Sequence, residues 1–159
     1  MRRVVRYALC AMVLVVAGQV AAQEKSANTN MDILKDKIKA DKKLLVASNM
    51  NLTDSEAKAF WPIYDAYQRD LQKINERLIK AITTYADAYN KDTLTDAQAK
   101  QITSDVIGVE ESEVTLRRTY AAKLAKVLPG KKVARYLQIE SKIRALVRFD
   151  LASQIPLVE

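Results

Sequence analysis

Apolar residues recur at alternating three- and four-residue steps along two long stretches of the chain. This spacing is typical of helices that pack along one face. The first stretch runs to residue 90 and contains Ala57, Phe60, Tyr64, Tyr67, Leu71, Ile74, Leu78, Ala81 and Tyr85. The second ends before Pro129-Gly130 and contains Ala99, Ile102, Val106, Val109, Leu116, Tyr120, Leu124 and Val127. Only a short turn separates them, so the pattern predicts a long antiparallel helical hairpin.

A shorter apolar pattern flanks the hairpin on each side. Residues 31–47 place Met31, Leu34, Ile38 and Leu45 near one face, and Asn30 can cap that helix. Residues 131–154 carry a face of Val133, Leu137, Ile143, Val147 and Leu151, and Pro156 ends the helix. The predicted fold class is therefore all-α, with four helices: the hairpin and its N- and C-terminal flanking helices.

Both hairpin helices begin with a capping signature. Thr53 and Thr95 each precede an acid or amide by three residues, Glu56 and Gln98. In a capping box the threonine hydroxyl accepts from the backbone N–H three residues on, and the longer side chain reaches back to the cap's own N–H. These four residues predict where the two helices start.

The N-terminus has the features of an export signal. Arg2, Arg3 and Arg6 precede an apolar run, and Ala22 offers a small residue for cleavage. The prediction is a signal peptide over residues 1–22, a flexible linker over 23–30 and a single helical domain over 31–159. Localisation would then be periplasmic, although an uncleaved anchor is the alternative.

Composition restricts the available chemistry. The chain has 159 residues, no His, three Gly and three Pro. Removal of residues 1–22 would leave 23 basic and 19 acidic residues, a net charge of +4, and no Cys. Serine nucleophiles would lack a histidine base, and no glycine-rich phosphate loop is present. The sequence therefore predicts neither an enzyme nor a bound cofactor.

Carboxylates are the only strong candidate metal ligands. Glu110 and Glu113 share a helical face, and Glu140 could approach them. Carboxylate-bridged metal sites in helical bundles normally add histidines, which this chain lacks. The prediction is a solvated acidic face, with Glu113 paired to a base such as Arg77.

Two features suggest contact with other proteins. The last helix is basic, and its candidate binding residues are Arg135, Lys142, Arg144 and Arg148. It could be an ordinary solvated helix, attract acidic protein segments or touch anionic lipid. Trp61 and Ile63 lie beside the hairpin seam, where they either join the core or leave an apolar patch for partners. Export argues against nucleic acid as a partner.

Together with the signal peptide and helix count, the motifs resemble the Spy/CpxP-like family of periplasmic helical proteins. That family is marked by Leu-Thr-x-x-Gln at helix starts. Residues 94–98 match the motif fully, and residues 52–56 match with Glu56 in place of Gln. The resemblance implies a bent hairpin that forms a homodimeric cradle. It also implies a chaperone that binds unfolded clients without ATP, or a regulator that occludes a membrane sensor domain. A structural envelope protein is a further alternative.

Overall fold

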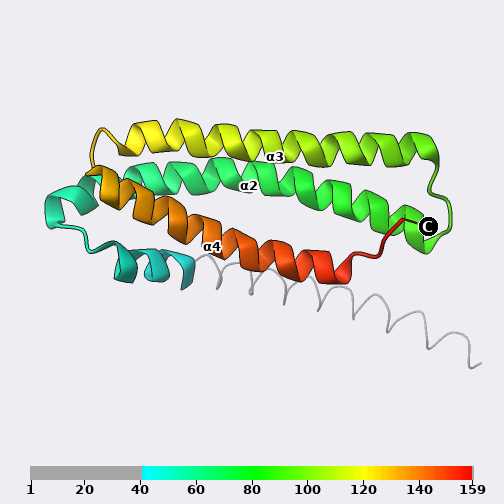
Figure 1. Cartoon of the computed structure of the whole chain (residues 1–159), viewed down its shortest axis with the longest axis horizontal. Coiled ribbons are helices and arrows are strands. Elements are labelled where there is room, and N and C mark those ends of the chain that lie inside the picture. The colour runs from blue at the N-terminus through cyan, green and yellow to red at the C-terminus, as the bar shows by residue number, and fades with distance from the viewer. Residues whose placement is uncertain (1–40, 159) are drawn as a thin grey trace, which may run out of the picture. The chain divides into compact units, whose positions relative to one another are not determined.

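The computed structural model describes residues 41–158 and confirms the all-α class (Figure 1). Four helices and no strand occur among these residues. The chain divides into two compact units, residues 1–49 and residues 50–159. The described residues of the first unit, 41–49, are helical, and this helix ends at residue 50, three residues beyond the predicted end. The predicted signal peptide and linker lie outside the described residues.

The hairpin consists of α2 (Asp54–Asn90) and α3 (Asp96–Leu124), which run in opposite directions (Figure 1). Both predicted capping boxes are present. The Thr53 backbone N–H donates to Glu56 Oε2 at 2.8 Å, and the Glu56 N–H donates to Thr53 Oγ1 at 3.3 Å. The corresponding distances for Thr95 and Gln98 are 3.0 and 3.3 Å. Each motif therefore satisfies backbone donors that the first turn of a helix leaves free.

A Schellman motif closes α2 at the turn. The Thr93 N–H donates to the carbonyl of Ala88 at 3.0 Å, and the Asp92 N–H donates to that of Tyr89 at 3.1 Å. Asp92 has a φ of 51°, the left-handed conformation that this motif requires. The turn thus ends α2 and reverses the chain into α3.

Aromatic side chains fill the core at the end of the hairpin where α2 begins. The rings of Phe60, Tyr64, Tyr67, Tyr120 and Tyr136 are all buried. Ring centroids lie 5.2 Å apart for Phe60 and Tyr136 and 5.3 Å apart for Tyr67 and Tyr120, both edge to face. This geometry is favourable for aromatic pairs, and it joins all three helices of this unit.

The last helix, α4 (Gly130–Gln154), lies along the hairpin, antiparallel to α3 (Figure 1). Its buried residues are Val133, Tyr136 and Glu140. Val147, predicted to face the core, is 53% exposed. The other residues of the predicted face point inward: Val133 is buried, and Leu137, Ile143 and Leu151 are partly buried. The sequence therefore located the helix and its inward side, to which the structure adds Tyr136 and Glu140.

The end of α4 is tied back to α2. The Tyr85 hydroxyl donates to the carbonyl oxygen of Pro156 at 3.0 Å. No described helix combines the length and apolarity that a bilayer span would require.

Candidate protein-binding surface

A charged cluster joins α3 to the C-terminal half of α4. Glu113 is only 4% exposed and forms ion pairs with both Arg144 and Arg148. Arg148 also binds Glu110, with 2.9 Å between Nη1 and Oε1. The hydrogen bond to Glu110 raises the pKa of Arg148. Two of the four predicted binding cations therefore face α3 and hold α4 in place.

Arg77 does not pair with Glu113, contrary to the prediction. Its Nη1 donates to Ser112 Oγ at 2.9 Å, and that hydroxyl donates to the Gly108 carbonyl at 2.6 Å. A Cβ at Gly108 would approach Arg77 Nη2 to 3.3 Å. Glycine thus leaves room for the guanidinium between α2 and α3, while arginines of α4 take the glutamate.

Glu140 belongs to a second polar cluster, between α2 and α4. Gln68 Nε2 donates to Glu140 Oε1 at 2.8 Å and to the Tyr136 hydroxyl at 3.3 Å. Burial raises the pKa of Tyr136, and it raises that of nearby Tyr67 to about 12. The three glutamates considered as metal ligands are therefore engaged by arginine or glutamine side chains. Within residues 41–158 no three potential ligands gather in a metal-binding group.

Lys132 links the start of α4 to the start of α2. Its Nζ lies 2.5 Å from Glu56 Oε2 and 2.9 Å from the Asn51 carbonyl oxygen. The hydrogen bond from Lys132 is the main cause of a lowered pKa at Glu56. Glu56 therefore caps α2 and also binds α4, which explains the value of a charged residue at this position of the motif.

The outward face of α4 presents cations and apolar side chains in one row. We call it the α4 stripe; its residues follow one another at steps of four, seven, four and three, and all are exposed: Lys131, Arg135, Lys142, Leu146 and Phe149. Such steps keep side chains on one side of a helix. Leu146 is 72% exposed and Phe149 is 77% exposed. The stripe brings the predicted residues Arg135 and Lys142 together with two apolar residues that the sequence interpretation missed.

A signal for these two residues exists in the sequence. Leu146 and Phe149 follow Lys142 at four and seven residues, off the helix face that Val133 and Leu137 define. Large apolar residues off the core face of an amphipathic helix are candidates for partner contact.

Trp61 and Ile63 belong to α2 and are both partly buried. The Trp61 ring lies edge-on to Phe60 and Tyr64, with centroid distances of 5.0 and 5.3 Å. For Trp61 this arrangement corresponds to the core alternative, at the margin of the aromatic cluster.

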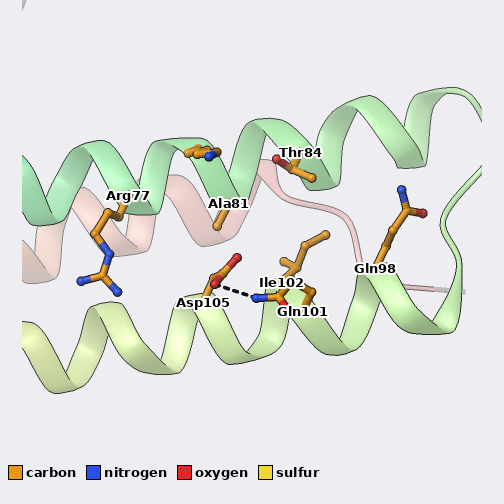
Figure 2. A pocket seen from close by; sticks show the side chains of 8 residues that line it. Arg77, Ala81, Thr84, Gln98, Gln101, Ile102 and Asp105 are labelled. Atoms are coloured by element: carbon orange, nitrogen blue, oxygen red, sulfur yellow. Dashed lines mark hydrogen bonds between the residues drawn. The ribbon is translucent and has the colours of Figure 1, made fainter.

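A solvent-open groove of about 270 Å³ lies between α2 and the first half of α3. Figure 2 shows Ala81 and Ile102 between polar side chains from both helices. On the α3 side of the groove, Gln101 Nε2 donates to Asp105 Oδ1, one turn further along the helix, at 3.0 Å. Arg77 and Lys80 add positive charge. The mixture is typical of a hydrated seam between helices.

The α4 stripe thus combines exposed cations with two large exposed apolar side chains. Such a surface can bind another macromolecule. Against known proteins, no protein-family model, no curated protein and no solved structure matches this chain.

Proposed function

We propose that the protein is an exported, ATP-independent binding protein that captures unfolded segments of other proteins, as an envelope chaperone does. The observation that carries the proposal is the α4 stripe. Leu146 and Phe149 stand 72% and 77% exposed, one to two helical turns from Lys142. Unfolded chains expose apolar side chains that such a surface can cover.

The charges give the stripe a second role. Long-range attraction between its cations and acidic client segments accelerates encounter. Two apolar side chains on the convex surface of a helix offer a client little area to bury. Each contact is therefore weak, and the client can dissociate without an energy source. Capture and release can therefore alternate without ATP.

The capping motifs support the same proposal by resemblance. Residues 94–98 match the helix-start motif of Spy/CpxP-like proteins, which act in the periplasm, and residues 52–56 match it with Glu56 in place of Gln. Unfolded or acidic proteins would then be the partners, and a homodimer would enlarge the binding surface.

An aggregation assay tests the chaperone proposal. The mature protein, in several-fold excess, should suppress light scattering by a reduced or heated client. Leu146→Ser combined with Phe149→Ser should remove most of this suppression. A matched control is Ile79→Ser with Ile107→Ser, two residues that are 55% and 51% exposed on α2 and α3. Absence of suppression by the unaltered protein would overturn the proposal.

Crosslinking in the periplasm decides between chaperone and regulator. A chaperone should yield many partners, each weakly. Recovery of one dominant membrane sensor would instead favour the regulator. A discrete self-complex with no other partner would favour a structural envelope protein.

A further inference from the structure

The α4 stripe is divided along the helix axis, with cations at one end and apolar side chains at the other. Lys131, Arg135 and Lys142 occupy the first part, and Leu146 and Phe149 the second. We infer that the stripe selects client segments in which an acidic block adjoins an apolar block, instead of segments in which the two residue kinds alternate. This inference rests on the proposed function and adds a rule for its substrates.

The dimensions of the stripe set the length of the segment. At ~1.5 Å of rise per residue, Lys131 to Lys142 spans about 16 Å, and Lys131 to Phe149 about 27 Å. An extended chain advances ~3.3 Å per residue, so about eight client residues would cover the stripe. The acidic block would fill roughly five of them and the apolar block the rest.

The electrostatics of α4 strengthen this division. The helix begins at Gly130 with no acidic residue in its first turn, so the positive end of its dipole adds to Lys131 and Arg135. At the other end, exposed Asp150 follows Phe149 and repels carboxylates. An acidic block is therefore favoured over the first part of the stripe and disfavoured over the second.

The same division argues against a membrane surface as the partner. A helix that lies in a bilayer interface has an apolar face along its whole length, with cations flanking that face. In the α4 stripe, by contrast, cations occupy more than half of the length, and the apolar side chains lie near the C-terminal end of the helix. A polypeptide with two unlike blocks fits this order better than a uniform lipid surface.

Peptides of identical composition test the inference. One peptide has five aspartates followed by three leucines or phenylalanines, and the second intersperses the same residues evenly. Because either chain direction can lie along the helix, the block peptide needs no fixed orientation. Its two blocks bind as linked contacts, so it should bind the mature protein about tenfold more tightly than the alternating peptide, measured by fluorescence anisotropy.

Variants assign the preference to the stripe. Lys131→Glu with Lys142→Glu, and separately Leu146→Ser with Phe149→Ser, should each abolish the difference between the two peptides. Ile79→Ser with Ile107→Ser should preserve it, and circular dichroism checks that all variants keep their helices. Equal affinity for both peptides would overturn the inference while leaving the proposed function intact if aggregation is still suppressed. Tighter binding to phosphatidylglycerol vesicles than to the block peptide would overturn it in favour of a membrane.

Discussion

Asp92 is one of two described non-glycine residues with a positive φ, and it occupies the position of a Schellman motif where glycine is usual. A side chain in the left-handed region is strained, although Asp tolerates it better than most residues. Asp92→Gly should therefore stabilise the protein by roughly 0.5–1 kcal/mol. Urea denaturation measures the change. Asp92→Ala is the opposing variant and should destabilise, and a stabilising alanine would refute the argument.

Glu56 has two functions in the structure, which substitution can separate. Glu56→Gln should keep the cap on α2 and lose the ion pair with Lys132. The loss of stability should be smaller than for Thr53→Ala, which removes the cap and should cost about 0.5–2 kcal/mol.

The difference in stability between the unaltered protein and the Glu56→Gln variant should depend on pH. The pKa of Glu56 lies below its ordinary value of 4.5 in the folded protein. Its stabilisation is therefore present above about pH 4.5 and is lost as the pH falls through the lower folded pKa. Melting temperatures of the protein and the Glu56→Gln variant should converge in that acid range. A difference that stays constant down to acid pH would mean that charge is not involved.

For individual residues, the sequence predicted interactions between near neighbours in the chain. The two caps join residues three apart, so the spacing of Thr53 and Glu56 identifies them directly. Lys132 is distant in sequence from Glu56, and nothing in the helical pattern near either residue indicates their contact. Arg77 illustrates the same limit: its pairing with Glu113 was wrong because the rotation of α4 decides which base reaches that glutamate.

Among the helices, apolar periodicity located each element and the side that faces the core, but not every residue on that side. In α2 and the second half of α3 the buried residues agree with the predicted seam, whereas Ala99, Ile102 and Val106 are only partly buried. For α4 the inward face includes Tyr136 and Glu140, which a pattern of apolar residues cannot recognise. Arg144 and Arg148, predicted as binding residues, instead pair with Glu113, and the exposed Leu146 and Phe149 were overlooked.

The charged cluster between α3 and α4 allows a sharp test of helix attachment. Side chains of Arg144 and Glu113 are 16% and 6% exposed, so their pair is largely buried. Arg144→Met should destabilise by about 3 kcal/mol, near the lower end for a broken buried pair, because Arg148 still contacts Glu113. Chemical denaturation measures the effect. Arg148→Met, at a 40% exposed position, should cost less.

A second substitution checks the cause. Replacing both partners, with Glu113→Leu and Arg144→Met, should recover much of the loss, because no buried charge then lacks a partner. A double variant that is as unstable as the sum of both single variants would instead point to lost packing.

For the whole molecule, net positive charge should govern the rate of association. Lys131→Glu with Lys142→Glu should slow the binding of an acidic client at low salt. The difference from the unaltered protein should shrink as salt shortens the screening length towards ~8 Å. Stopped-flow fluorescence at two salt concentrations measures both rates. Equal rates at low salt would mean that Lys131 and Lys142 are ordinary solvated surface charges that do not attract clients.

Burial along α3 is uneven, which has a consequence for how the molecule opens. All of its buried residues lie from Val109 onwards, while residues 96–108 include none and border the groove of Figure 2. Amide protons in that first half should exchange with solvent deuterium well before those after Val109, a gradient that mass spectrometry of peptic fragments can resolve. Uniform protection would contradict it. Local unfolding would then start near the turn of residues 91–95, at the opposite end of the hairpin from the aromatic cluster. The hairpin could therefore unfold and refold at this end while α4 stays bound to the rest of the molecule.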